Sequence, residues 1–540
     1  MTQPNRRTLE GLLARFAAEG RLRGTRLGGR PVASADLAST EVTGVTLDSR
    51  DVEPGSLFVA IPGQHLDGHD FAAAAIEAGA TGLIMERPVP GVAAPQILVD
   101  AARKALASAA AWWCGDPSHE LTVVGITGTD GKTTTAYLAV AALEAAGLPS
   151  GMIGTIATRI GGNTDAHAAH ATTPEAPELQ RTLRAMVDAG DRVAIIETTS
   201  HGLVLDRVAA VAYDIAILTN ITHEHLELHG TFEAYREAKL SLFDRLREAR
   251  HLTKPQPVPA TAIVNLDDPS AGLFIGTARD AGARVVTYGT EAAADVRATR
   301  IAEDANGLHI EVAGPRGPMT LDLRLSGRFN SHNALAVAAL GDVLDLDPAR
   351  IRAGMAALEV VPGRMERIEL GQPFGVVVDF AHSPASLTTV LDLLAPAAAA
   401  RGGGLIAVFG SAGERDTAKR PQMGRIAGER ARLVVVTDED PRGEDREAIL
   451  DEIARGAETV GRRRGHDLLL IADRREAIAA AFEAARPGDI VLLAGKGHEQ
   501  SIIGPDGEQP WDERAVAEEL LSRMIGAATP GTSMPPTTPP

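Results

Sequence analysis

Residues 121–146 read LTVVGITGTDGKTTTAYLAVAALEAA. Residues 121–127 are nearly all apolar or β-branched and predict a buried strand, whereas the Ala-rich residues 136–146 predict a helix. The glycines between them let the backbone turn tightly, and a helix N-terminus favours bound anions. Strand, glycine-rich turn and helix in this order predict a phosphate-binding loop, and with it an α/β fold.

Two residues of the turn have expected tasks. Lys132 contacts the outer phosphates of a nucleotide, and the hydroxyl of Thr133 ligates Mg²⁺. The general motif has a glycine where Ile126 stands, so the match is partial, and a Thr-rich turn without a ligand is the alternative. The predicted loop comprises Gly128, Thr129, Asp130, Gly131, Lys132, Thr133 and Thr134.

Strand and helix signals alternate along the rest of the chain, which favours parallel sheets covered by helices. Breaks at 115–118 and 361–363 contain Gly and Pro and mark domain boundaries. The chain therefore divides into residues 1–117, 118–361 and 362–526. The other predicted strands are 57–61, 82–85, 193–197, 214–218, 262–265, 376–380, 405–410, 433–437, 468–472 and 490–495, and the N-terminal helices are 72–78 and 101–113.

Composition limits the class of protein. The chain has 540 residues and a formal net charge of -18. This charge argues against nucleic acid and anionic membranes as main partners, because both need clustered Lys and Arg. The single cysteine, Cys114, rules out an intramolecular disulfide and is interpreted as a packing residue. Without a signal peptide or an apolar run of membrane-spanning length, and with a Pro- and Thr-rich tail at 527–540, we expect a cytoplasmic monomer with a disordered tail.

Polar side chains follow two of the predicted strands. Glu197 ends the strand 193–197, and His225 lies in the segment after the strand 214–218. Ligands of parallel α/β sheets bind at the carboxyl ends of the strands, so both side chains are expected beside the phosphate loop. Mg²⁺ prefers oxygen ligands and substrate phosphates, which makes Glu197 a candidate ligand and His225 a ligand or positioning group. Each residue alone is an ordinary polar side chain; their joint placement supports the hypothesis.

Lys239 lies within a helix predicted from residue 232 to 246, which Thr231 caps. It falls on the apolar stripe of that helix, four residues after Tyr235 and four before Phe243. An unpaired ammonium in such a place costs free energy. Either the side chain extends to solvent, which the pattern alone favours, or the amine is paired or chemically altered.

Three segments carry a resemblance to a known family: residues 128–134, 223–243 and 361–366. They resemble the Mur ligases, and the resemblance covers nearly the whole chain apart from the tail. It implies three α/β domains: a UDP-substrate-binding domain, a central P-loop ATPase domain and a C-terminal Rossmann-like ligase domain. Similarity to the members that add the third residue of the peptidoglycan stem peptide is carried by residues 47–50, 172–175, 197–201 and 410–421.

The resemblance also implies a reaction in peptidoglycan precursor synthesis. ATP phosphorylates the carboxylate of UDP-N-acetylmuramoyl-L-Ala-D-Glu, and a diamino acid then attacks the acyl phosphate. Lys239 would react with CO₂ to form N6-carboxylysine, an anionic Mg²⁺ ligand, which accounts for a lysine on an apolar stripe. The implied catalytic residues are Lys132, Glu197, His225 and Lys239, and the implied Mg²⁺ ligands are Thr133, Glu197, His225 and carbamylated Lys239.

Further contacts follow by position from the same resemblance. The implied ATP contacts outside the loop are Asn330, Arg364, Asp379 and His382. The implied contacts of the UDP-muramyl-dipeptide are Ser49, Arg50, Thr172, Thr173, Thr199 and Arg207. Arg415 would bind the α-carboxylate of the diamino acid, and the other implied contacts of that substrate are Glu439, Asp440, Pro441, Arg442, Gly495 and Glu499.

The identity of the diamino acid depends on residues 439–442, which read EDPR. In resembling proteins that use meso-diaminopimelate this stretch usually reads DNPR. Arg442 suits the second carboxylate of diaminopimelate. Asp440 would repel that carboxylate, neutralise Arg442 and favour L-lysine or L-ornithine. Because Arg442 has no other evident task, we favour diaminopimelate.

Two other functions stay open. A folylpolyglutamate synthetase shares the loop and the lysine, but not residues 48–50 or the basic loop 415–420. A nucleotide-binding regulator without catalysis would not need the full set of Lys132, Glu197, His225 and Lys239. Release of ADP stimulated by the UDP-muramyl-dipeptide, by folate or by neither separates the three hypotheses.

Overall fold

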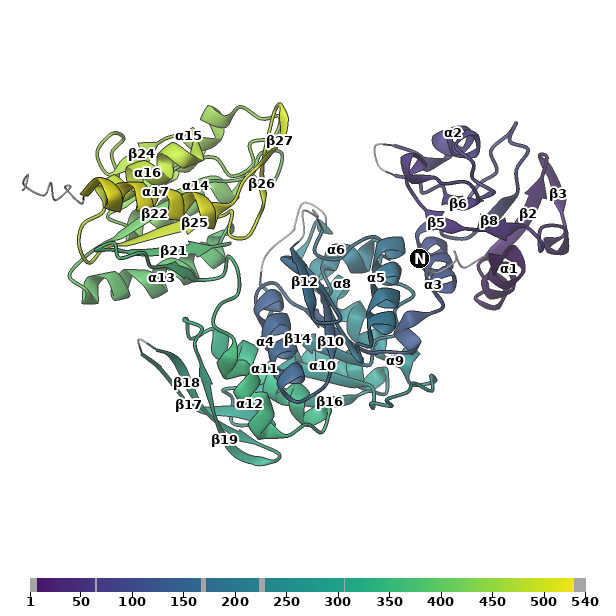
Figure 1. The fold of residues 1–540 in the computed structure, drawn as a ribbon, viewed down its shortest axis with the longest axis horizontal. Helices are drawn as coiled ribbons and strands as arrows, with labels where there is room; N and C mark the ends of the chain where they lie inside the picture. The colour runs from purple at the N-terminus through teal and green to yellow at the C-terminus, as the bar shows by residue number, and fades with distance from the viewer. Residues whose placement is uncertain (1–6, 64–65, 167–170, 223–228, 305, 529–540) are drawn as a thin grey trace, which may run out of the picture.

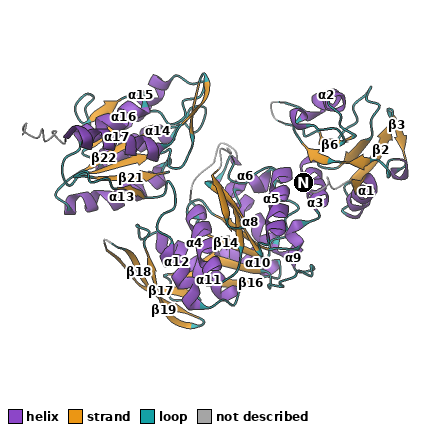
Figure 2. Cartoon of the chain, in the orientation of Figure 1, coloured by secondary structure: helices purple, strands orange, loops and turns teal. Residues whose placement is uncertain are grey.

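The computed structural model describes residues 7–63, 66–166, 171–222, 229–304 and 306–528. Figure 1 shows three bodies, with the N-terminal and C-terminal bodies on either side of the central one. In Figure 2 the strands of each body are flanked by helices, which is the α/β arrangement predicted from the sequence. Each of the three large sheets lies within one of the three predicted segments.

The N-terminal body is built on a six-stranded sheet in the order β3-β2-β8-β7-β6-β5. β5 to β8 run parallel, and β2 and β3 extend the sheet in antiparallel fashion. The strands are β2 (Leu22–Leu27), β3 (Arg30–Val32), β5 (Gly44–Thr46), β6 (Ser56–Val59), β7 (Gly82–Met85) and β8 (Gln96–Val99), with β1 (Arg7–Thr8) paired to β4 (Glu41–Val42). The helices are α1 (Leu9–Ala18), α2 (Ala72–Glu77) and α3 (Ala102–Cys114).

The central body holds an 11-stranded sheet in the order β12-β11-β10-β13-β9-β14-β15-β16-β17-β18-β19. β9 lies between β13 and β14 and is parallel to both, so their carboxyl ends meet at one edge. The strands are β9 (Thr122–Thr127), β10 (Ser150–Ile153), β11 (Ala157–Ile160), β12 (Asn163–Ala166), β13 (Val193–Glu197), β14 (Ile215–Leu218), β15 (Thr261–Asn265), β16 (Arg284–Gly289), β17 (Val296–Asp304), β18 (Gly307–Gly314) and β19 (Gly317–Leu323). The helices are α4 (Lys132–Ala145), α5 (Ala176–Ala189), α6 (Ser200–Val204), α8 (Phe232–Asp244), α9 (Leu246–Ala249), α10 (Ala271–Asp280), α11 (Asn330–Val343) and α12 (Pro348–Ala357).

The C-terminal body has a six-stranded sheet in the order β20-β21-β25-β22-β23-β24, parallel except for β20. The strands are β20 (Glu366–Ile368), β21 (Gly375–Asp379), β22 (Leu405–Phe409), β23 (Leu433–Val436), β24 (Leu468–Leu470) and β25 (Ile490–Ala494), followed by the hairpin β26 (Ser501–Gly504) and β27 (Gly507–Pro510). The helices are α13 (Pro384–Ala400), α14 (Lys419–Arg430), α15 (Arg446–Glu458), α16 (Arg474–Ala484) and α17 (Glu513–Ala528). The tail predicted from residue 527 thus begins in the last turn of α17.

The predicted strands are confirmed, with ends that differ by at most two residues. The expected parallel strands form the centre of each large sheet, and antiparallel strands extend all three sheets. The largest such extension is the meander β17–β19. Its strands alternate buried with exposed residues along much of their length, as one-sided antiparallel strands do, and so lack the continuous apolar runs by which the other strands were predicted.

Cys114 is buried at the end of α3, and burial raises the pKa of its thiol to about 11. This confirms its interpretation as a packing residue, because a thiol that stays protonated is a poor nucleophile. Among the helices in the described part of the chain, none combines the length and the apolar character that a membrane crossing requires.

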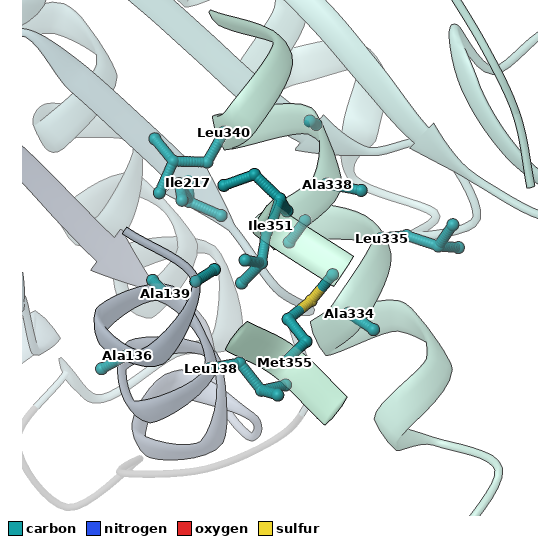
Figure 3. Packing of buried hydrophobic residues seen from close by; sticks show 14 of the residues in the cluster. Ala136, Leu138, Ala139, Ile217, Ala334, Leu335, Ala338, Leu340, Ile351 and Met355 are labelled. Atoms are coloured by element: carbon teal, nitrogen blue, oxygen red, sulfur yellow. The ribbon is translucent and has the colours of Figure 1, made fainter. Parts of the chain in front are cut away.

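Helices α4, α11 and α12 pack closely in the core of the central body. Figure 3 shows Leu138 of α4 close to Met355 of α12, and Leu340 of α11 and Ile351 of α12 belong to the same buried cluster. Gly354 lies at the crossing of α12 with α4, where a Cβ would meet the carbonyl oxygen of Ala141 at 2.3 Å. Helix α4, which follows the phosphate loop, therefore packs against α12 with its backbone in close contact.

The C-terminal body joins the central one through Gly363, which has a φ of 64°. A Cβ there would meet the backbone nitrogen of His498 at 2.3 Å, so the connection lies directly on the loop after β25. The ring of Phe380 lies 4.9 Å from the ring of His498 and 4.7 Å from the guanidinium carbon of Arg364. Burial, with help from the charges of Arg364, Lys496 and His382, lowers the pKa of His498 to about 3.

We predict that Gly354→Ala destabilises the protein by about 1–3 kcal/mol, although alanine favours helices, because the added methyl group forces α12 away from α4. Gly276→Ala is the matched control, since Gly276 also lies in a helix and nothing approaches its Cβ position within 4 Å. The control is expected to stabilise by about 0.5–1 kcal/mol. Urea unfolding of both variants measures the difference, and equal effects would contradict the close crossing.

We also predict that His498 stays neutral in the folded protein between about pH 5 and pH 8. Only the unfolded chain takes up a proton there near the ordinary value of 6.5, so the contribution of His498 to stability is full above pH 6.5 and declines as the pH falls toward 3. NMR titration of the histidine rings, assigned with His498→Gln, measures this. His309 is the control, because a hydrogen bond to Asp322 raises its pKa; a His498 resonance that titrates with it would contradict the prediction.

Candidate active site

Two glycines set the path of the loop between β9 and α4. Gly128 has a φ of 150°, and a Cβ there would meet Thr219 Oγ1 at 1.8 Å. Gly131 has a φ of 84°, and a Cβ there would meet Asn333 Oδ1 at 2.5 Å. Both positions therefore exclude a side chain by backbone conformation and by close contact, which is the structural reason for the glycines.

Lys132 begins α4, and its side chain folds back onto the loop. Its Nζ donates hydrogen bonds to the carbonyl oxygens of Gly128 (2.9 Å) and Thr129 (2.7 Å). The hydroxyl of Thr129 lies 3.0 Å from the hydroxyl of Tyr235 on α8. The ammonium and the N-terminus of α4 thus place positive charge in one turn, as a site for phosphate groups requires.

Glu197 is fully buried where β13 ends. Its Oε2 accepts hydrogen bonds from the hydroxyls of Thr133 (2.9 Å) and Thr155 (2.8 Å), and its Oε1 accepts one from the backbone nitrogen of Thr155 (3.0 Å). The hydroxyl oxygens of Thr155 and Thr172 also lie 3.1 Å apart, within hydrogen-bond distance. Thr155 was not predicted from the sequence, because β10, the strand before it, was not predicted either.

The predicted magnesium ligands are partly brought together. The carboxylate of Glu197 and the hydroxyl of Thr133 form a pair of oxygen donors of the kind that Mg²⁺ prefers. His225 lies outside the described residues. Within the described ranges, no group of three or more His, Cys, Asp or Glu side chains is arranged to hold a metal.

A row of hydrogen bonds continues from Glu197 along the sheet edge. The hydroxyl of Thr173 donates to the backbone carbonyl of Glu197 (2.8 Å), accepts from the backbone nitrogen of Thr199 (3.0 Å) and lies 3.0 Å from the hydroxyl of Thr199. Arg207 donates to the carbonyl oxygen of Thr173 (2.9 Å) and to Glu175 (2.9 Å). The predicted substrate contacts that lie beside Glu197 are therefore Thr172, Thr173, Thr199 and Arg207.

Lys239 is 2% exposed on α8. Its Nζ donates to the carbonyl oxygen of Gly128 at 2.8 Å and lies 4.6 Å from the centre of the Tyr235 ring. The interpretation of a side chain that extends to solvent is wrong: the amine is buried and paired. Helix α8 is thereby joined to the loop between β9 and α4 through a hydrogen bond from a buried amine.

Asn330 begins α11 and contacts the loop through a second asparagine. The amide nitrogen of Asn330 donates to the carbonyl oxygen of Ser326 (2.7 Å), and its Oδ1 accepts from Asn333 (2.8 Å). Asn333 in turn accepts from the hydroxyl of Thr135 on α4 at 3.2 Å. Asn333 was missed from the sequence, although its place one helical turn after Asn330 puts both side chains on the same face.

The predicted ATP contacts of the C-terminal body lie at the end of β21. Asp379 is buried, and its carboxylate accepts the backbone N–H groups of Met365 (2.7 Å) and Ala381 (2.8 Å). Burial raises the pKa of Asp379, the charge of Arg364 opposes that rise, and the charge of Asp130 adds to it. Asp130 belongs to the phosphate loop, so the end of β21 lies within electrostatic range of that loop.

His382, a predicted ATP contact, and Arg50, a predicted contact of the UDP-muramyl-dipeptide, form hydrogen bonds with residues close to them in the chain. A ring nitrogen of His382 lies 2.9 Å from the carbonyl oxygen of Phe380. Arg50 lies in the N-terminal body with an exposed guanidinium that donates to Asp48, and this pairing lowers the pKa of Asp48 to about 2. Ser49 precedes Arg50 in the same short 3-10 helix.

The predicted diamino-acid contacts follow three neighbouring strands of the C-terminal sheet. Arg415 is exposed in the loop after β22, Pro441 lies in the loop after β23, and Gly495 follows β25 directly. The backbone nitrogen of Gly413 donates to the carbonyl oxygen of Asp440 at 2.8 Å, which joins the first two loops. Among the described residues, Glu439 Oε2 and Arg442 Nε are buried atoms without a hydrogen-bond partner.

The interpretation of Asp440 needs correction. Its Oδ1 accepts hydrogen bonds from Lys496 Nζ (2.8 Å) and from the backbone nitrogen of Ile503 (3.0 Å). Lys496 also pairs with Glu499 at 2.7 Å. The charge of Asp440 is therefore compensated by Lys496 and not by Arg442. The carboxylate is held by hydrogen bonds from the loop after β25 and from the hairpin β26–β27.

Comparison with known proteins agrees with this geometry. Three family models match the chain: "Mur ligase family, catalytic domain" at residues 41–113, "Mur ligase middle domain" at 126–341 and "Mur ligase, glutamate ligase domain" at 363–497. The UDP-N-acetylmuramyl-tripeptide synthetase of Roseiflexus sp. (strain RS-1) is 47% identical over 488 residues, or 90% of this chain and 95% of that protein.

Two further relatives agree with this assignment. A UDP-N-acetylmuramoyl-L-alanyl-D-glutamate--2,6-diaminopimelate ligase of Geobacter metallireducens is 41% identical over 90% of this chain and 96% of that protein. A solved structure named as a ligase of that same activity has a TM-score of 0.61 and 30% identity, covering 91% of this chain and 96% of that one. The chain belongs to the Mur ligase family.

Proposed function

We propose that this chain is an ADP-forming ligase that joins a diamino acid to UDP-N-acetylmuramoyl-L-Ala-D-Glu during peptidoglycan precursor synthesis. One observation carries the proposal: Glu197 accepts hydrogen bonds both from Thr133 of the phosphate loop and from Thr155, which continues to Thr172. The carboxylate of Glu197 therefore links the proposed nucleotide site to the threonine hydroxyls that are proposed to bind the UDP-muramyl-dipeptide. The names of the relatives in Roseiflexus and Geobacter supply the substrate class.

The chemistry divides into two transfers. First, a carboxylate oxygen of the D-Glu residue attacks the γ-phosphorus of ATP, which gives an acyl phosphate and ADP. The amine of the diamino acid then attacks the acyl carbon, phosphate leaves, and the amine loses a proton. Lys132 and the N-terminus of α4 stabilise the transferred phosphoryl group electrostatically. Thr133 and Glu197 would hold Mg²⁺, which supplies charge neutralisation at the phosphates.

Lys239 is proposed to become a carbamate. The lone pair of its neutral amine attacks CO₂, a proton is released, and an anionic carboxylate forms at the end of the side chain. The observation behind this step is a buried amine that donates to the carbonyl oxygen of Gly128, inside the phosphate loop. Oxygen donors at that place suit Mg²⁺ better than an ammonium does.

For the diamino acid, we favour meso-diaminopimelate. The argument against it rested on the charge of Asp440, and Lys496 compensates that charge. Arg442 remains as a guanidinium for the second carboxylate, and Glu499 as a carboxylate for the second amine. L-Lysine and L-ornithine are the other outcomes of the test.

Two alternatives have weaker support. A folylpolyglutamate synthase of Mycobacterium tuberculosis matches with a TM-score of 0.57 at 20% identity, which is a likeness of fold alone. A regulator that only binds nucleotide would have no use for a fully buried carboxylate beside the loop and a buried lysine donating into it.

We predict that ATP is converted to ADP and phosphate only when UDP-N-acetylmuramoyl-L-Ala-D-Glu and a diamino acid are both present. Equal concentrations of meso-diaminopimelate, L-lysine and L-ornithine are offered together, and the mass of the product identifies the one used. Diaminopimelate is expected. Formation of AMP and pyrophosphate would contradict the acyl-phosphate mechanism, and exclusive use of L-lysine or L-ornithine would contradict the proposed substrate.

We predict that Lys239→Ala lowers kcat by at least about 100-fold, because it removes an anionic group beside the phosphates. Small carboxylates such as formate are expected to restore part of the turnover. Lys104→Ala, at an exposed lysine on α3, is the control and should keep full activity. Thermal unfolding checks that both variants fold. A fully active Lys239→Ala variant would contradict the carbamate proposal.

A further inference from the structure

A buried lysine joins two loops of the C-terminal body. Lys496 is 1% exposed, and its Nζ lies 2.8 Å from Asp440 Oδ1 and 2.7 Å from Glu499 Oε2. Asp440 belongs to residues 439–442, here called the β23 loop, and Glu499 belongs to residues 495–499, here called the β25 loop. One ammonium therefore connects the two loops through two carboxylates.

Asp440 extends the connection to other elements. The backbone nitrogen of Ile503 in β26 donates to its carboxylate at 3.0 Å, and the backbone nitrogen of Arg442 donates to the carbonyl oxygen of Ile503 at 2.8 Å. The carbonyl oxygen of Asp440 accepts from Gly413, in the loop that carries Arg415. Loss of the partner of Asp440 would therefore disturb the loops after β22, β23 and β25 and the start of the hairpin β26–β27.

The charges of the cluster need one another. Burial by itself lowers the pKa of Lys496, but the charges of Glu499 and Asp440 raise it, so the amine stays protonated. Burial raises the pKa of Glu499, Lys496 lowers it, and the charges of Glu439 and Asp440 add to the rise. A buried charge that loses its partner strongly destabilises the folded protein. Because separation of these charges is costly, the three side chains are held at fixed distances from one another.

We propose that Lys496 is the positioning residue of the diamino-acid subsite. By pairing with Asp440 and Glu499 at once, it holds the β23 loop against the β25 loop and sets the spacing between Arg442 and Glu499. Those two side chains offer a cation and an anion to the far end of a diamino acid. Asp440 is then the counter-ion of Lys496 and not a specificity charge. This inference rests on the proposed function of the two loops.

The test is Lys496→Met, which keeps the length and the burial of the side chain and removes its charge. The KM for the diamino acid is expected to rise by about 10- to 100-fold, because a displacement of about 1 Å in a positioning group has effects of this size. The KM values for ATP and for the UDP-muramyl-dipeptide should change by less than about twofold, because the predicted contacts of both substrates lie outside the cluster of Asp440, Lys496 and Glu499.

A second readout is the pH dependence of the diamino-acid KM. Glu499 binds an ammonium only when it is ionised, and Lys496 favours the ionised form. Removal of Lys496 leaves Glu499 facing Glu439 and Asp440, which raises its pKa. The pH below which diamino-acid binding weakens should therefore move upward in Lys496→Met, a change that a general loosening of the fold does not produce.

Lys254→Met is the matched control. Lys254 is also a buried lysine paired with an aspartate, Asp214, but it lies in the central body. Its replacement is expected to lower the Tm and to leave the diamino-acid KM unchanged. If Lys496→Met fails to fold, the double variant Asp440→Asn with Lys496→Met takes its place, because it leaves no uncompensated aspartate. The raised KM is expected there as well.

The outcomes separate the two proposals. If the native protein releases no ADP with any of the three diamino acids, the proposed function fails. If the native protein is active and a folded Lys496 variant has the native diamino-acid KM, the inference about Lys496 fails while the function stands. A parallel rise of all three KM values would also overturn it, since that is the signature of a merely structural lysine.

Discussion

The buried carboxylate of Glu197 is the constraint around which the central body is organised. A carboxyl group at that depth requires hydrogen-bond donors, and Thr133 and Thr155 supply three. To do so, the helix after β9 and the turn after β10 must both reach the end of β13, which fixes the strand order β10-β13-β9 at this edge. The hydrogen bond from Lys239 to the carbonyl oxygen of Gly128 also holds α8 against this edge of the sheet.

Buried charged groups also constrain the C-terminal body. Two buried cations of that body, Arg474 and Lys496, each join elements that the chain separates widely. Arg474 is fully buried between Glu513 and the carbonyl oxygens of Asp438 and Ala494. Lys496 joins the β23 and β25 loops in the same way. Charges without access to water must be paired, so these cations hold the loops at the strand ends in one geometry.

Prediction from the sequence succeeded where the signal was local. The apolar run 193–197 became β13 without a change of either end, and the turn from Gly128 to Lys132 became a loop that feeds directly into α4. The meander β17–β19 was missed, because its residues alternate in burial and form no apolar run. Lys239 was recognised as unusual by its place on an apolar stripe, but the pattern could not say whether the amine was solvated or paired.

The sequence by itself determined the strands that form continuous apolar runs, the place of the glycine-rich loop and the polar side chains at the ends of those strands, because these depend on neighbours within a few positions. The tertiary structure alone decided the partners: Thr155 for Glu197, Gly128 for Lys239 and Lys496 for Asp440. The physical reason is that a charged group pairs with a polar group that the fold brings within about 3 Å. The order of the strands sets this distance, and the separation of the two residues along the chain does not.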